Sequence, residues 1–204
     1  LAYYKNHARN HLPWRKTRDP YKILVSEVML QQTQVDRVIP KYEAFIKKYP
    51  TAQKLAAASL TDVLRLWSGL GYNRRARYLW EAARGGTKGI GPYTAAAVRA
   101  FAYNEPVTMI ETNIRTVYLH HLFQKSAKVS DKKLLPYIVV PKGVEPRVWY
   151  AALMDYGSYL KAKYPNPSRR SAAHTKQKSF AGSDRQIRGA ILRAHLGGTN
   201  VAGY

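Results

Sequence analysis

The stretch that decides the fold is Lys88-Gly89-Ile90-Gly91-Pro92-Tyr93-Thr94-Ala95-Ala96-Ala97-Val98. Two glycines around one apolar residue allow a tight backbone turn, and proline suits the first turn of the helix that follows. The free amides and the positive dipole end of such a helix can meet a phosphate. Taken alone, the stretch is equally consistent with a plain turn between two helices, so its interpretation depends on the rest of the chain.

The charge of the chain favours a polyanionic partner. Its 204 residues include 34 lysines and arginines against 12 aspartates and glutamates, a formal net charge of +22 at pH 7. Self-repulsion at this charge opposes the compact state, so a merely soluble basic surface does not account for it. Together with the glycine turn, the charge predicts a helix–hairpin–helix element that grips the DNA backbone without reading bases.

Several classes of site are excluded by composition. Cysteine is absent, which excludes disulfides, thiolate zinc sites, iron–sulfur clusters and cysteine nucleophiles. The six histidines show no spacing typical of metal ligands, so we expect no metal site. No apolar run approaches the length of about 20 residues that spans a bilayer, and the first residues lack the apolar core of a signal peptide. We therefore expect no membrane contact and a cytoplasmic location, associated with the nucleoid if the cell is prokaryotic.

The hydrophobic pattern predicts an all-α protein, because apolar residues recur at helical spacing and no stretch alternates for long enough to form a sheet. The expected helices cover residues 21–38, 41–48, 52–57, 61–67, 74–83, 92–102, 113–123, 132–138, 146–160 and 183–195. Between Tyr164 and Gly182 the composition is typical of an exposed linker. This basic segment and the helix after it are either a solvated tail or, as their charge favours, a phosphate-binding arm.

Four further segments carry a resemblance. They are Leu12-Pro13-Trp14-Arg15, Ser26-Glu27-Val28-Met29-Leu30-Gln31-Gln32-Thr33-Gln34-Val35, Trp67-Ser68-Gly69-Leu70-Gly71-Tyr72 and Met109-Ile110-Glu111-Thr112-Asn113-Ile114-Arg115-Thr116-Val117. With the glycine hairpin, and in this order, they resemble the MutY-type A/G-specific adenine DNA glycosylases of the helix–hairpin–helix superfamily. The resemblance implies a two-lobed all-α fold. A six-helix lobe covers residues 22–105, a second lobe combines residues 1–21 and 106–165, and a basic linker and C-terminal helix follow at 166–204.

The resemblance implies a monomeric enzyme that excises adenine mispaired with 8-oxoguanine or guanine in double-stranded DNA. Cleaving the N-glycosidic bond needs protonation of the leaving base and stabilisation of an oxocarbenium-like sugar. Glu27 fits the first role, because desolvation within the apolar stretch 23–30 would raise its pKa and keep a proton available. The alternative is a helix glutamate that reaches solvent or pairs with a basic residue.

Glu111 matches the second carboxylate of the resembled family, an aspartate in a D-x-N-V pattern. Here the pattern reads Glu111-Thr112-Asn113-Ile114, so the carboxyl is kept on an arm one methylene longer. We assign Glu111 stabilisation of the sugar cation, with Asn113 orienting it, against the alternative of a helix cap. Tyr93 stands where bifunctional relatives carry a lysine that forms a Schiff base, so a monofunctional glycosylase is implied. The alternative for Tyr93 is packing behind the hairpin.

By resemblance, Gln32 and Thr33 contact the base opposite the target, while Tyr72 wedges into the base stack and helps repay the cost of unstacking. The alternative is a polar helix end and a buried loop tyrosine. The remaining residues of the expected DNA-binding set are Gln31, Leu70, Gly89, Gly91, Thr94, Arg169, Arg170, Arg185 and Arg188.

The sequence departs from the family in two further places. Residues 161–170 replace a four-cysteine loop that holds a [4Fe–4S] cluster, so we expect no cofactor. The segment Arg84–Lys88 is too short for the first helix of the hairpin, so we expect that a stretch of about 20 residues, enough for one helix, is missing there. Two other functions remain open: a thymine or uracil mismatch glycosylase, which Tyr93 permits equally, and a non-catalytic DNA-lesion-binding protein, if Glu111 is only a cap.

Overall fold

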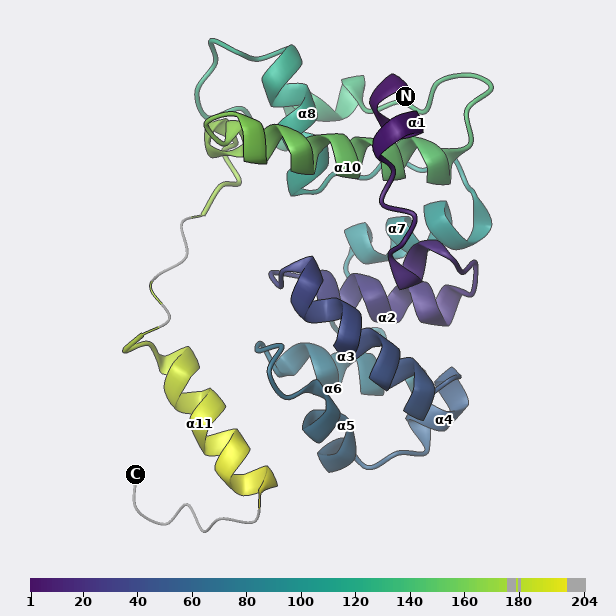
Figure 1. Ribbon diagram of the computed structural model, residues 1–204, viewed down its shortest axis with the longest axis vertical. Coiled ribbons are helices and arrows are strands. Elements are labelled where there is room, and N and C mark those ends of the chain that lie inside the picture. The colour runs from purple at the N-terminus through teal and green to yellow at the C-terminus, as the bar shows by residue number, and fades with distance from the viewer. Residues whose placement is uncertain (176–178, 180, 198–204) are drawn as a thin grey trace. The chain divides into compact units, whose positions relative to one another are not determined.

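The computed structural model describes residues 1–175, 179 and 181–197, and within them the regular structure is helical (Figure 1). The one strand-like pairing in this part of the chain is an isolated bridge between Val129 and Ser171. The predicted all-α class is therefore confirmed. Residues 176–178, 180 and 198–204, which belong to the expected linker and C-terminal segment, lie outside the described residues.

The backbone contacts divide the chain into two units. Unit 1 consists of Leu1–Pro20 and Pro92–Lys176, and unit 2 of Tyr21–Gly91 and Gln177–Tyr204. The sequence placed a boundary after residue 105, whereas in this division it falls after residue 91. The reason is that helix α7 (Pro92–Tyr103) packs on helix α10 (Pro146–Lys163) and contributes Ala97 and Ala100 to the core of unit 1.

Unit 1 is built around α8 (Thr112–His121) and α10, which lie side by side (Figure 1). Its core includes Ile114 and Leu119 of α8 and Tyr150 and Leu160 of α10, all nearly inaccessible to solvent. The other elements of unit 1 are α1 (Ala2–His7), α7, α9 (Asp131–Leu134) and 3₁₀ turns at Pro13–Arg15, Leu135–Tyr137 and Pro167–Arg170.

The expectation of an exposed linker over residues 164–182 is wrong for its first part. Pro167, Ser168 and Ser171 are buried, and the 3₁₀ turn Pro167–Arg170 packs on α8. The Arg170 guanidinium donates to the backbone carbonyls of Leu119 (2.7 Å) and Gln124 (2.6 Å). Carbonyls at the end of a helix lack partners within the helix, so an arginine that reaches them fixes the turn in place. Composition alone did not indicate this contact.

Unit 2 contains α2 (Pro20–Leu30), α3 (Val35–Lys48), α4 (Ala52–Ala56), α5 (Leu60–Trp67), α6 (Arg74–Ala83) and α11 (Asp184–Leu196). The rings of Phe45 and Trp67 meet edge to face in its core, at a centroid distance of 6.2 Å. Helix α11 packs on α5, where the Arg65 Nε donates to the carbonyl of Leu196 at 3.4 Å.

The helix expected over residues 21–38 is in fact two helices, separated at residues 31–34. Gln32 lies in the break with φ 55°, a left-handed conformation that cannot continue a helix. The carbonyls of Val28 and Met29, which would accept helical bonds, accept instead from the guanidinium of Arg75, both at 2.9 Å. Pro40, expected to separate two helices, lies inside α3.

The glycine hairpin follows α6 directly, because α6 ends at Ala83 and residues 84–91 lead to α7. Gly89 has φ 84°, and a Cβ there would lie 2.2 Å from the ring of Tyr78, so only glycine fits. Gly91 has no such restriction, since nothing lies within 4 Å of its ideal Cβ. The expectation that a helix-forming stretch is missing before the hairpin stays a prediction.

Candidate active site

Glu27 lies in the middle of α2 and is only 8% exposed. The residues on either side of it, Ser26 and Val28, are buried as well, and the Ser26 hydroxyl donates to the carbonyl of Ile23 at 2.7 Å. A buried carboxyl on a rigid helix can present its proton in one direction, which is the geometry that a general acid needs. The expected burial of Glu27 is thus present, and its catalytic role stays a prediction.

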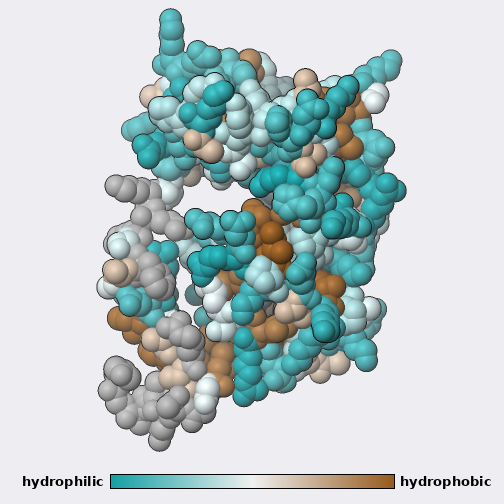
Figure 2. All heavy atoms as spheres, viewed as in Figure 1, coloured by the Kyte–Doolittle hydropathy of each residue, from teal (hydrophilic) through white to brown (hydrophobic). Residues whose placement is uncertain are grey.

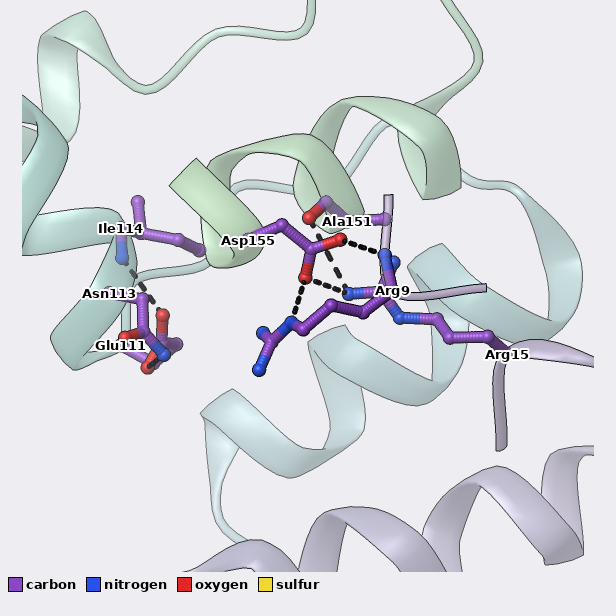
Figure 3. Close-up of polar contacts among 7 residues, drawn as sticks. All are labelled: Arg9, Arg15, Glu111, Asn113, Ile114, Ala151 and Asp155. Atoms are coloured by element: carbon purple, nitrogen blue, oxygen red, sulfur yellow. Dashed lines mark hydrogen bonds and ion pairs between the residues drawn. The ribbon is translucent and has the colours of Figure 1, made fainter. Parts of the chain in front are cut away.

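Glu111 is the residue before α8 and caps it (Figure 3). One carboxyl oxygen accepts from the backbone N–H of Ile114 at 2.8 Å, and the other accepts from the side-chain amide of Asn113 at 3.2 Å. The cap that we considered as an alternative therefore exists, and so does the contact through which Asn113 orients the carboxyl. Both bonds fix the carboxyl in space, as a role in catalysis also requires.

The electrostatic environment of Glu111 favours its neutral form. Burial raises the pKa of Glu111, and this effect outweighs the opposing hydrogen bonds from Asn113 and Ile114 and the positive charges of Lys161 and Arg115. Burial also lowers the pKa of Lys161, which the negative charge of Glu111 partly offsets. Because ionising a buried carboxyl costs free energy, its negative charge gains the most electrostatic stabilisation when a positive charge forms beside it.

Helix α10 determines where the start of α8 lies. A Cβ placed on Gly157 would lie 2.2 Å from the carbonyl oxygen of Asn113, so the two backbones meet without a side chain between them. Two residues earlier on α10, the buried Asp155 accepts from Arg9 and Arg15 of the N-terminal segment (Figure 3). Sequence reasoning assigned no role to Asp155 or Gly157, and the available signal was a carboxylate and a glycine close together within one predicted helix.

In unit 2, Arg75 brings together residues from two of the expected DNA-contacting segments. Its guanidinium binds the loop at Gln31 and Thr33 and the loop at Leu70 and Gly71. Sequence reasoning also missed Arg75. The available signal was its position on α6, one residue before Ala76 and four before Leu79, on the face that is buried.

The other expected DNA-binding residues differ in accessibility. Gln32 and Tyr72 are exposed, whereas the side chains of Leu70 and Thr94 are 3% and 2% exposed. Arg169 is exposed, while Arg170 holds the carbonyls at the end of α8. Tyr93 is partly buried and packs against the core of unit 1, which is the packing alternative considered for it.

The C-terminal helix α11 carries two of the basic residues expected to bind DNA, Arg185 and Arg188. Arg185 donates to the hydroxyl of Tyr72 at 2.9 Å and lies 5.9 Å from the centre of its ring. Arg188 is exposed and forms a surface pair with Asp184 at 3.4 Å.

Hydrophilic residues cover most of the surface seen in Figure 2. The part of the chain that the structure describes has no cluster of three or more residues able to hold a metal, and none of its helices is long and apolar enough to cross a membrane.

Comparisons with known proteins show the family to which the chain belongs. Residues 25–138 match the model of the HhH-GPD superfamily base excision DNA repair protein family. The adenine DNA glycosylase of Mycolicibacterium smegmatis is 36% identical over 228 residues, covering 94% of this chain and 77% of that protein. Since that alignment is longer than the 204 residues here, the relative carries residues that this chain lacks. The human adenine DNA glycosylase is 39% identical over 143 residues, covering 57% of this chain and 26% of that protein.

Two solved structures share the fold. A thermostable thymine-DNA glycosylase has a TM-score of 0.62 and 28% identity, over 75% of this chain and 80% of that one. A non-covalent endonuclease III–DNA complex has a TM-score of 0.60 and 16% identity, over 95% of this chain and 93% of that one. The helical fold and these similarities define the class as the helix–hairpin–helix DNA N-glycosylases, which bind DNA. Within this class, the chain belongs to the HhH-GPD superfamily of base excision DNA repair proteins and to its adenine DNA glycosylase family.

Proposed function

We propose that the protein hydrolyses the N-glycosidic bond of adenine mispaired with 8-oxoguanine or guanine in double-stranded DNA. The observation that carries the proposal is Glu111, a carboxyl held in one orientation by Ile114 and Asn113 and costly to ionise where it lies. Such a carboxylate is suited to stabilise a positive charge that develops on a deoxyribose ring. The related adenine DNA glycosylases of mycobacteria support adenine as the target base.

The reaction divides between two carboxyls. Glu27 gives its proton to the adenine as the bond between base and sugar breaks, and the bonding electrons leave with the base. Glu111 stabilises the oxocarbenium-like sugar until the oxygen of a water molecule bonds to the anomeric carbon. The Oδ1 atom of Asn113 is buried and, within the described residues, has no hydrogen-bond donor, so it is available to accept from that water. The proton that the water releases replaces, through solvent, the one that Glu27 gave to the base, and the products are free adenine and an abasic site.

Tyr93 makes the proposed enzyme monofunctional. A phenol cannot form a Schiff base with the sugar, so the sugar–phosphate strand stays intact after the base has left. The position of Tyr93 on α7, against the core of unit 1, also gives the ring a packing role. The two roles are compatible, because only the ring edge needs to reach the bound nucleotide.

The proposed enzyme acts as a monomer and without a cofactor. The chain has no cysteine, so it offers no thiolate to hold an iron–sulfur cluster, and no step of the reaction uses one. In place of a cluster loop, we assign DNA contacts to the exposed Arg169 and to Arg185 and Arg188 of α11. We place the protein with the DNA, in the nucleoid if the cell is prokaryotic.

A second candidate is excision of thymine from a mispair. It is favoured by the similarity in fold and sequence to the thermostable thymine-DNA glycosylase. The chemistry differs mainly at the base, because thymine offers carbonyl oxygens where adenine offers ring nitrogens. The sugar half of the reaction, assigned to Glu111, is the same for both.

The experiment that separates these functions is single-turnover excision from duplexes with one A·8-oxoguanine, A·G, T·G or U·G pair. Abasic sites are cleaved with alkali and counted, and a parallel sample without alkali measures strand cleavage by the protein. We expect the A·8-oxoguanine and A·G duplexes to react and the sample without alkali to stay intact. Fast reaction of the T·G duplex alone selects the second candidate, and binding without excision of any base selects a lesion-binding protein.

The matched control is Glu27→Gln, which keeps the size of the side chain and removes its proton. Loss of a general acid lowers a rate by about 100-fold or more, and we expect that loss with nearly unchanged affinity for the duplex. A near-normal rate in this variant removes Glu27 from the mechanism.

A further inference from the structure

Arg75 is a buried cation at the junction of two loops of unit 2. Only 8% of the residue is exposed, and its guanidinium donates to the carbonyls of Val28 and Met29, both at 2.9 Å. It also donates to the carbonyls of Gln31 and, at 3.1 Å, Gly71. The C-terminal end of α2 and the loop after α5 are therefore bound to the same side chain. Helix α2 is the one that carries Glu27.

The remaining contacts of Arg75 complete this junction. The guanidinium donates to the hydroxyl of Thr33 at 2.9 Å and to the carbonyl of Leu70 at 3.3 Å. It lies 5.5 Å from the ring centres of both Trp67 and Tyr72. The two terminal nitrogens of the planar guanidinium make all these contacts while the group faces two rings, and Nε has no partner within the described residues; a lysine ammonium has three donors on one atom.

Two residues held at this junction have strained backbones. Gln32 has φ 55° and Tyr72 has φ 48°, the left-handed region that residues other than glycine seldom adopt. Such a conformation costs free energy and persists only where surrounding contacts enforce it. Both residues are exposed, so burial of their own side chains does not enforce it, and Arg75 binds the residues beside each of them, Gln31 and Thr33 on one loop and Gly71 on the other.

Charge supports the same interpretation. Burial lowers the pKa of Arg75 to about 10, so the side chain is still protonated at neutral pH and keeps its donors. Its charge faces the carbonyl end of α2, where the helix dipole is negative. Removing this charge would leave several carbonyls of two loops without a partner.

We propose that Arg75 is a positioning residue that holds Gln32 and Tyr72 in the strained conformations needed to open the duplex at the target pair. The inference rests on the proposed function, in which Gln32 contacts the opposite base and Tyr72 wedges into the stack. Because strain is stored before DNA arrives, the loops do not have to be ordered during binding, and the energy of binding is available for unstacking.

The test compares Arg75→Lys with Arg77→Lys, in chains that also carry Glu27→Gln so that the duplex is not consumed. Arg77 is the control because it lies on the same helix, is largely exposed and forms a surface pair with Glu81 at 2.7 Å. The probe is a duplex with 2-aminopurine next to the target adenine, since this base fluoresces more strongly when it is unstacked. Affinity for an undamaged duplex of the same length is measured in parallel.

We expect Arg75→Lys to lose most of the fluorescence gain, with affinity for the undamaged duplex unchanged, while Arg77→Lys keeps both. In chains with Glu27 restored, Arg75→Lys should lower the single-turnover rate by about 10-fold or more. A fluorescence gain equal to that of the parent chain would overturn the proposal. So would an equal loss of gain and of affinity for undamaged DNA, since that pattern marks a merely structural arginine.

A second variant covers the case in which Arg75→Lys does not fold. Trp67→Phe keeps Arg75 but removes the indole N–H that donates to the carbonyl of Gly71 at 3.2 Å, so it loosens the same loop. We expect a partial loss of the fluorescence gain, and a full gain overturns the proposal. If the parent chain excises thymine rather than adenine, the proposed function fails by itself, and the same variants are compared on the T·G duplex.

Discussion

The carboxyls of Asp155 and Glu111 belong to the same unit but are held by different kinds of donor (Figure 3). Asp155 accepts from the backbone and Nε of Arg9, at 3.0 and 2.7 Å, and from Arg15 at 3.1 Å. In the contacts that Figure 3 draws, Glu111 accepts hydrogen bonds from two neutral donors, the N–H of Ile114 and the side-chain amide of Asn113. Asp155 is thus bonded directly to two arginines, whereas Lys161 and Arg115 act on Glu111 through their charge. The contrast leads to a prediction: the fully paired Asp155 serves the fold, and the partly paired Glu111 acts in the reaction.

The largest expected effect is on stability, from Asp155→Asn. The Asp155 side chain is 1% exposed, and its loss leaves Arg9 and Arg15 without their anion. Breaking a buried ion pair from one side costs about 3 kcal/mol of the free energy of unfolding. Urea unfolding monitored by circular dichroism measures this loss.

The comparison requires that this variant, where folded, still excises adenine at nearly the parent rate. A large loss of rate in protein shown to be folded would break the distinction, because Asp155 would then act on the reaction as well as on the fold.

The next effect is on the rate, from Glu111→Gln. The amide keeps the cap in part but carries no charge, so we expect the single-turnover rate to fall by about 100-fold or more, about 2.7 kcal/mol of transition-state stabilisation. Glu111→Asp restores the carboxylate on the shorter arm of the resembled family and should remain active. A Glu111→Gln chain that is less stable but equally fast would show that Glu111 is only a cap.

The pH dependence sharpens the same point. Burial raises the pKa of Glu111, so the anion that stabilises the sugar is lost at a higher pH than for an ordinary glutamate. Below that pKa the rate should fall about tenfold for each pH unit, and this limb should vanish in Glu111→Gln. The effect on stability has the opposite sign. Protonated Glu111 contributes stability that is complete below the ordinary value of 4.5 and is lost as the pH rises through the raised pKa.

The smallest expected effect extends the comparison to the arginines. Arg170 is bound to carbonyls of the fold, as Asp155 is bound to arginines, whereas Arg188 is exposed on α11. Removing residues 177–204 should weaken binding to specific and non-specific duplexes alike. The slope of log K against log salt should flatten by about 0.9 for each lost phosphate contact. An unchanged slope would show that this segment is a passive tail. Its arginines would then make no contact with DNA phosphates.

The contrast also shows which features the sequence could predict. The helical class and the apolar surroundings of Glu27 follow from local patterning, and the contact of Asn113 with Glu111 was expected from the resemblance to the family. The break in α2 and the packing of Arg170 depend on partners far along the chain, Arg75 and Leu119. A local pattern does not contain such partners, and for this reason the helix over residues 21–38 and the linker were wrong.

The absence of a side chain at Gly157 lets α10 and α8 touch directly, which bears on how the contact between the two helices opens. The backbones of Gly157 and Asn113 touch, and the same turn of α10 carries Asp155, which binds the amide of Arg9. We expect an opening of α10 at this turn to free the Arg9 amide and also the start of α8, where the Ile114 amide donates to Glu111. Amide protons that share one opening event exchange with solvent at one free energy. We therefore expect the amide protons of Arg9 and Ile114 to exchange with similar free energies, so that the N-terminal segment and the loop of Glu111 lose their order together.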